Sequence, residues 1–263
     1  MASHETVDLR VDGGAATILL NRPDSLNAWN EQFGLDLLDA VESVAGDEGV
    51  RAVMITGAGR AFSSGADLKE ERGADEGVPD LSKRLKELYH PIILGIREME
   101  KPVIAAVNGP AVGIGCSLAL DCDLIVAAQS SYFLLAFVNI GLVPDGGSTA
   151  LLPAKIGITR TAEMGLLGEK VPAAKAMEWG IVNRVCADER LEDDAGELLA
   201  HLAAGPTRSY ANFKKLLNRQ VYAGMADQLE AEADAQREQG QTQDFIEGVM
   251  AFIQKRPPEF TGR

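Results

Sequence analysis

A run of nineteen residues without a charged side chain, 102–120, restricts the fold more than any other feature of the chain. Its length is close to that of a membrane-spanning helix. The residues NGP at 108–110 and two further glycines, Gly113 and Gly115, interrupt it, and such residues break a continuous helix. We therefore predict a short buried strand, a glycine-rich loop and a helix that begins near Ile114.

The rest of the first two thirds alternates strand and helix patterns. Apolar and charged residues alternate over 7–12, and the Gly13-Gly14 turn leads into the apolar stretch at 16–20, which is typical of a hairpin. Apolar residues recur at helical spacing over 29–45. RAVMITG at 51–57 and DLIVAA at 123–128 have the composition of buried strands. This alternation predicts an α/β protein.

The C-terminal part contains only helical patterns. Four helix-like stretches separated by glycine or proline follow Arg190. We predict a core over 1–195 and a C-terminal helical region over 196–263 that packs on the core or on another subunit. Upstream, the charged, glycine-bearing segment 69–79 predicts a surface loop, and 81–101 predicts a helix kinked at Pro91.

Composition excludes several partner classes. The chain of 263 residues carries a formal net charge of −14, which disfavours nucleic acid and anionic membranes because both require a basic surface. Its three cysteines and three histidines are scattered, without the spacing of a metal site. We expect no metal, and the polar N-terminal residues together with the cysteine usage predict a cytoplasmic protein.

Two common catalytic motifs are incomplete. GAGRAF at 57–62 follows a predicted strand but has Phe62 where the dinucleotide-binding fingerprint requires its third glycine. No serine has the flanking glycines of the nucleophile elbow G-x-S-x-G. The sequence therefore favours neither a nicotinamide cofactor nor serine-hydrolase chemistry.

Two glycine-bearing loops, at 59–68 and 108–118, each follow a predicted buried strand. Each could direct a backbone N–H group toward one point and so form an oxyanion hole, or each could be an ordinary strand-to-helix turn. Asp145, in GLVPDGGST, leaves a similar choice between the polar residue of a tight turn and a functional carboxylate. Spacing alone leaves both choices open.

The chain resembles the crotonase, or enoyl-CoA hydratase/isomerase, superfamily in five motifs that occur in the same order from about Asn21 to Val185. The motifs are LNRPDSLNAW, GRAFSSGADL, KPVIAAVNGPAVGIGCSLALDCDLIVAA, FLLAFVNIGLVPDGGS and AMEWGIVNRV. The C-terminal residues DFIEGVMAFIQKRPPEFTG are similar to those of bacterial isomerase-like members. The resemblance implies a crotonase-like spiral of ββα units with a C-terminal helical oligomerisation region, assembled as a homotrimer or hexamer.

The resemblance also implies a small-molecule acyl-CoA substrate, with coenzyme A as part of the thioester and no separate cofactor. The backbone N–H groups of Ala66 and Ile114 would form the oxyanion hole. Ser117 and Phe137 stand where the hydratases of the family carry their two glutamates, so Asp145 would be the one acid at a family position. This favours double-bond or ring isomerisation with Asp145 as general base. The alternatives are an enoyl-CoA hydratase and a non-catalytic acyl-CoA-binding protein.

The resemblance implies roles for several further residues. His90 lies in a region where dehalogenase relatives carry a histidine that activates water; with Asp145 as nucleophile it would support hydrolysis, although a histidine on the flank of a helix needs no such role. Residues that resemble the coenzyme A-binding positions of the family are Arg22, Ser64, Asp67, Leu68, Lys255 and Arg256, and Phe137 would be a further substrate-binding residue. Asp67 could instead cap a helix, and Lys255 and Arg256 could be a solvated helix end.

Overall fold

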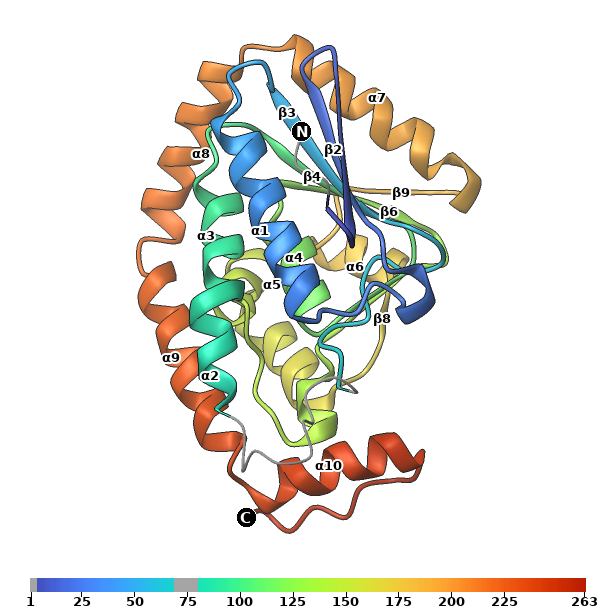
Figure 1. Ribbon diagram of the computed structural model, residues 1–263, viewed down its shortest axis with the longest axis vertical. Helices are drawn as coiled ribbons and strands as arrows, with labels where there is room; N and C mark the ends of the chain where they lie inside the picture. Colours follow the sequence, from blue (N-terminus) through green and yellow to red (C-terminus); the bar gives the residue numbers. More distant parts are fainter. Residues whose placement is uncertain (1–3, 69–79) are drawn as a thin grey trace.

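A computed structural model describes residues 4–68 and 80–263 of the protein. The surface loop expected at 69–79 lies outside the described residues. Within them, two sheets form the framework around which the helices pack, as Figure 1 shows. The larger sheet has the strand order β1-β2-β3-β4-β6-β9, and the smaller sheet has the order β5-β7-β8.

The larger sheet is mostly parallel. β1 and β2 form the expected antiparallel hairpin, and every later neighbour pairs in parallel. In the smaller sheet β5 and β7 are parallel and β8 is antiparallel to β7. The strands are β1 (Val7–Asp12), β2 (Ala15–Leu20), β3 (Ala52–Gly57), β4 (Val103–Val107), β5 (Pro110–Val112), β6 (Leu124–Ala128), β7 (Tyr132–Leu134), β8 (Val171–Pro172) and β9 (Arg184–Cys186).

The helices surround the sheets, and the four predicted after Arg190 are confirmed as α7 to α10. Short 3-10 segments occur at Pro23–Ser25, Ala136–Ile140 and Asp188–Arg190. The helices are α1 (Glu31–Gly46), α2 (Leu81–Arg84), α3 (His90–Glu98), α4 (Ile114–Asp121), α5 (Ser148–Leu167), α6 (Ala173–Trp179), α7 (Leu191–Ala204), α8 (Thr207–Val221), α9 (Met225–Gln239) and α10 (Gln243–Gln254).

Side chains of the central strands alternate between two cores, because neighbouring residues in a strand point to opposite faces. Met54, Ile104 and Val126 face α7 and form one core with its leucines. Ile55, Ala105 and Ile125 belong to the second, larger core, which includes residues of α1, α3 and α4. Burial on both faces explains why these strands have continuous apolar sequences.

The strand and the helix predicted in the uncharged run at 102–120 are confirmed as β4 and α4, and α4 begins at Ile114; the segment expected as a glycine-rich loop also contains the short strand β5. Between these elements the chain turns at 108–109, where a side chain on Gly109 would collide with the backbone of Arg60. Over residues 4–68 and 80–263, no helix is both long and apolar enough to cross a membrane.

The helix predicted over 81–101 is present but irregular. α2 continues into a π-helical turn at Leu85–Tyr89, and α3 follows with Pro91 in its first turn. Because proline has no N–H to donate, the chain preceding it accommodates the ring by widening one turn. The kink expected at Pro91 is therefore a π-helical turn just before it.

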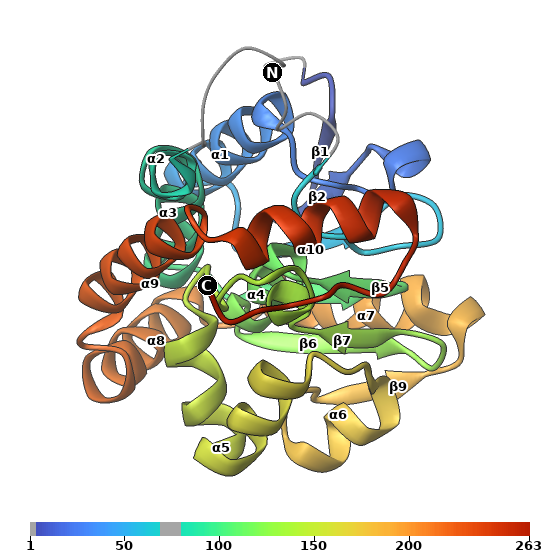
Figure 2. The same cartoon turned by 90° about the horizontal axis from the view of Figure 1, so that it is seen from below.

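The C-terminal helices wrap around the core. α8 and α9 lie beside α3 and α2 along one side of the molecule (Figure 1). α10 crosses one end and contacts the 3-10 segment Ala136–Ile140, as seen from below in Figure 2. This packing brings residues beyond 225 next to the loop that contains Asp145.

Candidate active site

The loop after β3 runs as an extended segment between two other parts of the chain. The Trp29 N–H donates to the Gly65 carbonyl at 2.8 Å, and the Asp67 N–H donates to the Trp29 carbonyl at 2.9 Å. On the other side, the Val112 N–H donates to the Ser63 carbonyl at 2.9 Å. Because backbone groups alternate direction along an extended chain, the N–H of Ala66 points away from Trp29.

The loop after β5 lies directly against this segment. Gly113 has φ +54° and leads into α4, whose first residue is Ile114. A methyl group added at Gly65, where φ is +93°, would lie 3.0 Å from the Val112 carbonyl oxygen and 3.8 Å from the Gly113 Cα. Both positions require glycine because both have positive φ. The backbone of residues 65–66 therefore lies beside that of 113–114. The N–H groups of Cys116 and Ser117 donate to the Gly113 carbonyl, whereas the N–H of Ile114, the first residue of α4, precedes the first bond of the helix.

Two buried polar side chains, which sequence reasoning missed, support these loops. The Ser63 hydroxyl donates to the Asn27 carbonyl at 2.8 Å and accepts from the Trp29 indole N–H at 3.1 Å. The Asn27 amide donates to three carbonyls of the loop after β3. Gly115 is required here, since a methyl group on it would lie 2.5 Å from the Ser63 Cβ. Asn27 stands in the motif LNRPDSLNAW and Ser63 in the glycine-bearing motif GRAFSSGADL, but only their fully buried position reveals the bonds.

Asp145 lies in the loop between Ile140 and α5, and its side chain is buried. Its backbone carbonyl accepts a hydrogen bond from the Ser117 hydroxyl at 2.7 Å. A methyl group on the next residue, Gly146, would lie 2.5 Å from the Ile114 Cδ1 and 2.8 Å from the Ser117 Cβ. The Asp145 loop is thus packed on the first turn of α4, which is the turn that begins with Ile114.

The surroundings of this junction are apolar. Phe137 is 8% exposed, and its Cζ would lie 3.8 Å from a methyl group added at Gly113. Leu142 follows the same 3-10 segment and donates its N–H to the Phe137 carbonyl at 2.9 Å. An aromatic ring therefore stands beside the glycine of the second loop.

A row of polar side chains on α9 holds the other side of the Asp145 loop. Gln236 donates to the Asp145 Oδ2 at 2.7 Å and to the Val143 carbonyl at 2.8 Å. Glu232 accepts from the N–H groups of Gly147 at 2.7 Å and Thr149 at 3.0 Å, at the start of α5. A carboxylate is favoured at that position because the helix N-terminus is electropositive, although burial raises the pKa of Glu232.

Comparisons with known proteins agree with this geometry. A family profile described as "Enoyl-CoA hydratase/isomerase" matches residues 10–263. The chain is a member of that family. It is 40% identical over 254 residues to the 1,2-epoxyphenylacetyl-CoA isomerase of Escherichia coli, covering 96% of this chain and 97% of that protein.

Two further matches support this membership. The trans-2-decenoyl-[acyl-carrier-protein] isomerase of Streptococcus mutans is 35% identical, over 96% of this chain and 97% of its own length. The crystal structure of an enoyl-CoA hydratase from Mycobacterium avium subsp. paratuberculosis superimposes with a TM-score of 0.90 at 37% identity, over 98% of this chain and 100% of that one. The protein therefore has the crotonase fold and belongs to a family of acyl-CoA enzymes.

In this family member His90 points toward α9. It is 5% exposed, and its Nδ1 lies 3.7 Å from the Glu230 Oε1. Glu230 also forms an ion pair with Lys86, at 2.7 Å. Burial lowers the pKa of His90, and the nearby Glu230 carboxylate partly opposes this shift. The charged groups that act on His90 among the described residues are therefore Glu230 and Lys86.

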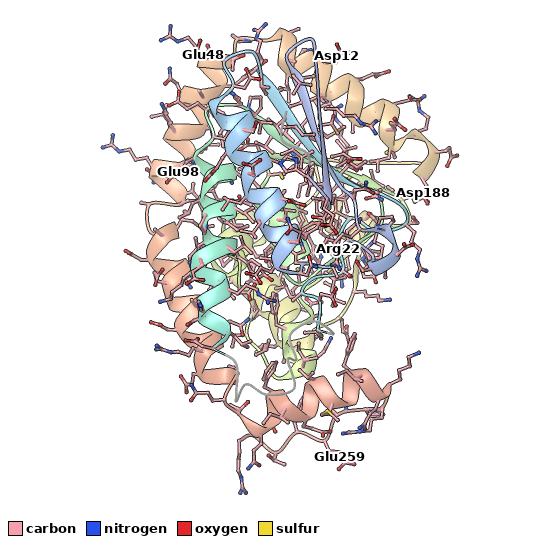
Figure 3. All side chains as sticks on the ribbon, viewed as in Figure 1. Asp12, Arg22, Glu48, Glu98, Asp188 and Glu259 are labelled. Carbon is pink, nitrogen blue, oxygen red and sulfur yellow. The ribbon has the colours of Figure 1, made fainter. Side chains whose placement is uncertain are left out.

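Four of the six residues matched to coenzyme A-binding positions lie together. Arg22 forms an ion pair with Asp67, with 3.2 Å between Nη1 and Oδ2. The Ser64 N–H donates to the Leu26 carbonyl at 2.9 Å, and Leu68 is the last described residue before the gap. Figure 3 shows Arg22 near the middle of the molecule, below the sheet. Asp67 and Leu68 directly follow Ala66, and the ion pair brings Arg22 to this segment.

Lys255 and Arg256 lie at the end of α10. Lys255 adopts φ +55° and terminates the helix. The guanidinium of Arg256 forms a two-pronged ion pair with Glu247, with 2.7 Å between Nη2 and Oε2. The arginine lowers the pKa of the Glu247 carboxyl to about 2. Arg256 is thus already paired with a side chain of α10.

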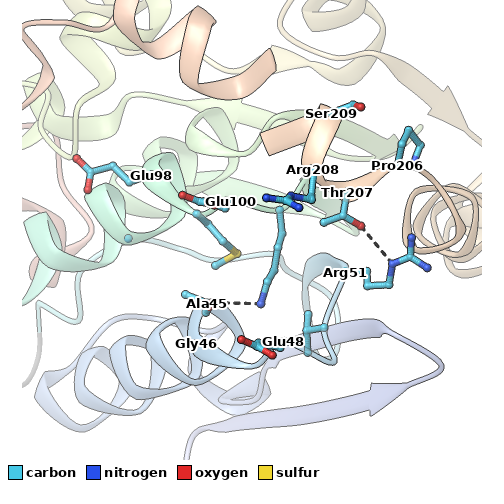
Figure 4. Close-up of a pocket in the computed structure, with 14 residues that line it drawn as sticks. Ala45, Gly46, Glu48, Arg51, Glu98, Glu100, Pro206, Thr207, Arg208 and Ser209 are labelled. Carbon is cyan, nitrogen blue, oxygen red and sulfur yellow. Dashed lines mark hydrogen bonds between the residues drawn. The ribbon is translucent and has the colours of Figure 1, made fainter. Parts of the chain in front are cut away.

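A cleft of about 1110 Å³ lies at the other end of the parallel strands. Its walls come from the end of α1, the segments before β3 and β4, and the start of α8, as Figure 4 shows. Glu48 and Glu98, which line it, lie well away from Arg22 in Figure 3. Two of the cations that line it are engaged, because Lys101 donates to the Ala45 carbonyl and Arg51 to the Gly205 carbonyl; Arg208 lines it as well.

Residues 4–68 and 80–263 contain no group of three or more histidine, cysteine or acidic side chains arranged to hold a metal ion.

Proposed function

We propose that this protein isomerises acyl-CoA thioesters, with Asp145 as the general base and the N–H groups of Ala66 and Ile114 as the oxyanion hole. The observation that carries the proposal is the packing of the Asp145 loop on the first turn of α4. Gly146 contacts both Ile114 and Ser117 there, so a buried carboxylate and a helix N-terminus share one apolar site.

The proposed reaction conserves all atoms of the substrate. The Asp145 carboxylate removes a proton from the carbon next to the thioester carbonyl, and the electron pair of that C–H bond moves into the carbonyl group as an enolate. Protonated Asp145 then returns the proton two carbons further along, and the double bond moves into conjugation with the carbonyl. One carboxylate is sufficient because the proton leaves and returns on the same group.

Backbone donors suit the enolate intermediate. Negative charge develops on the thioester oxygen, and preorganised N–H groups stabilise it without reorientation, each contributing about 2.7–4 kcal/mol to the transition state. Gly65 and Gly113, which lie against each other, support the pairing of the two loops. The Phe137 ring would exclude water and strengthen these interactions. Together with Leu142 and Val143 it would also desolvate Asp145 and raise its pKa toward neutral pH.

For the coenzyme A part of the substrate, we propose that Arg22, Ser64, Asp67 and Leu68 line the path of the adenine and pantetheine. Lys255 and Arg256 are the proposed partners of its phosphates. Arg256 would have to leave its exposed ion pair with Glu247 for this contact, and exposed pairs of that kind contribute little stability.

Hydration is the nearest alternative, since solved relatives include an enoyl-CoA hydratase. At the two positions of the family's glutamates this chain has Ser117 and Phe137. The Ser117 hydroxyl is engaged with the Asp145 carbonyl, and neither side chain can transfer the protons of hydration as a carboxylate would. The similarity to two proteins named as isomerases supports isomerisation instead.

Two other activities remain as alternatives to be tested. Asp145 could act as a nucleophile with His90 activating water, which would require His90, whose Nδ1 lies 3.7 Å from the Glu230 Oε1, to serve the water instead. A protein that binds acyl-CoA without turnover would need neither the buried Asp145 carboxylate nor the hydrogen bond donated to it.

We propose that the region 196–263 mediates assembly into a homotrimer or hexamer, and that the protein works in the cytoplasm. Exposed apolar side chains on α8 support the first point, with Phe213 62% and Leu216 66% exposed; such surfaces mark subunit contacts. The free thiols of Cys116, Cys122 and Cys186 support a reducing compartment.

The decisive experiment incubates 2-enoyl-CoA and 3-enoyl-CoA thioesters with the wild-type protein and with Asp145→Asn in heavy water, and follows the products by mass spectrometry. We expect deuterium incorporation and double-bond migration without gain of water, and loss of both in Asp145→Asn. Aryl-CoA halides in the same panel report on the nucleophilic alternative.

Three results would contradict the proposal. Gain of one water that survives Asp145→Asn indicates a hydratase, and loss of halide indicates nucleophilic chemistry. Saturable binding of the thioesters, measured by thermal shift, without exchange or turnover indicates a binding protein.

A further inference from the structure

One face of α9 carries three polar side chains four residues apart: Gln228, Glu232 and Gln236. Residues at this spacing lie one above the other on a helix, and all three reach the segment 143–149. Gln228 donates to the Thr149 hydroxyl at 2.8 Å, and Glu232 accepts from backbone N–H groups at the start of α5. In this row only Gln236 contacts the Asp145 carboxylate.

The orientation of the Gln236 amide is fixed by its neighbours. Its Nε2 lies 2.7 Å from the Asp145 Oδ2 and 2.8 Å from the Val143 carbonyl oxygen, so both N–H bonds have acceptors. Reversing the amide would place its oxygen against two other oxygens. The Gln236 side chain is 2% exposed, and its Oε1 is buried without a hydrogen-bond partner in the described part of the chain.

A buried glutamine is unfavourable as simple packing. Leaving its carbonyl oxygen without a donor costs free energy, whereas methionine or leucine would fill the same space without that cost. The two donated bonds are therefore the feature that distinguishes glutamine from an apolar residue here. One of them fixes the backbone two residues before Asp145, and the other restrains the carboxylate itself.

We propose that Gln236 is a positioning residue that orients the Asp145 carboxylate for proton transfer. The inference rests on the proposed function, because it assigns a supporting partner to the same base. Gln236 holds Oδ2 in place and so directs the rest of the carboxylate, and a hydrogen bond to the ionised form keeps the base available at lower pH.

Other ionisable groups near this site are accounted for by different partners. Glu232 faces the start of α5, and Glu230 faces His90 and Lys86. On α4, Cys116 and Asp121 are fully buried in the core. Among the hydrogen bonds described for Asp145, the one from Gln236 is the contact that a substitution on α9 can remove without introducing a charge.

The test compares Gln236→Met, Gln236→Glu and Gln228→Met with the wild-type protein and Asp145→Asn. Gln228→Met is the matched control, because it removes a polar contact from the same helix face without touching the carboxylate. The measurements are kcat and KM of isomerisation between pH 5 and 9, and the ¹³C NMR titration of the Asp145 carboxyl in labelled protein, assigned by its absence in Asp145→Asn.

We expect Gln236→Met to lower kcat roughly 10- to 100-fold with little change in KM. The acid limb of its kcat profile should move up by about one pH unit, with the same shift in the NMR titration. Gln236→Glu should move the limb further, since two adjacent carboxyls share a proton. Gln228→Met should keep the wild-type profile.

If both Gln236 variants keep the wild-type pH profile of kcat and the wild-type NMR titration of the Asp145 carboxyl, the inference is overturned. An inactive Asp145→Asn would in that case still support the proposed function, which would then stand without the inference. If Asp145→Asn keeps full turnover, the proposed function fails. The NMR titration still decides, independently of activity, whether the Gln236 hydrogen bond sets the protonation of Asp145.

Discussion

Replacing Gly65 by alanine tests whether the contact between the two glycine loops matters for both stability and catalysis. The residue has φ +93°, and an added methyl group would lie 3.0 Å from the Val112 carbonyl oxygen. An alanine in this region costs about 1–2 kcal/mol in backbone energy, and the close contact brings the expected loss of unfolding free energy to about 2–3 kcal/mol.

For a domain of this size each kcal/mol lowers Tm by roughly 2–4 °C, so the variant should melt roughly 4–12 °C below the wild type. The effect on kcat should be larger than the effect on stability, because Ala66 follows Gly65 directly and its N–H would be displaced. Losing one oxyanion donor typically lowers kcat about 100- to 1000-fold.

The assay combines differential scanning calorimetry with isomerase kinetics at a temperature well below both melting points. Gly46→Ala is the matched control, since Gly46 ends α1 and no atom would lie within 4 Å of an added methyl group. If Gly65→Ala matches Gly46→Ala in both Tm and kcat, the loops are not in the tight contact described here, and the reasoning fails.

Two further substitutions probe the site and the core. Gly146→Ala should lower the free energy of unfolding by about 1–3 kcal/mol and should also lower kcat, because its methyl group would collide with the Ile114 side chain. Adding Ile114→Val, which removes the Cδ1, should restore part of the stability, measured by urea unfolding, and part of kcat. A double variant without this rescue would contradict the reasoning. Burial raises the pKa of Asp121 to about 7, with Arg97 opposing the shift. Because its folded-state pKa lies above the ordinary 3.8, the protonated Asp121 stabilises the fold at low pH, and this contribution is lost as the pH rises toward 7. Asp121→Asn should therefore flatten the decline in unfolding free energy between pH 4 and 7. An unchanged dependence of unfolding free energy on pH would show that Asp121 is ionised throughout.

The elements of the fold were largely predictable because their signals are local. A period of two or a continuous apolar run identified β1, β2, β3, β4 and β6, and a period near 3.6 identified α1 and the four helices after Arg190. The short strands β5, β7, β8 and β9 and the helices α5 and α6 were not predicted. The start of α4 at Ile114 followed from the glycines around it. The π-helical turn before Pro91 was expected only as a kink, since the period of the pattern does not show how a helix accommodates proline.

The family motifs identified Asp145, Ala66 and Ile114 as candidates, and they left the competing interpretations open. Nothing in the spacing of residues 65 and 113 shows that their backbones touch. Nor does the sequence show that His90 lies beside Glu230, which follows 140 positions further along the chain. Such contacts depend on how the elements pack, and no local pattern encodes their distance.

The amino-acid sequence by itself thus determined the longer strands, most of the helices and the position of the two glycine-bearing loops. Only the tertiary structure decided that Gln236, from the C-terminal helices, donates to the Asp145 carboxylate. The physical reason is that periodicity reports the environment of each residue along its own element. A hydrogen bond between residues 91 positions apart forms only when independent elements are packed together.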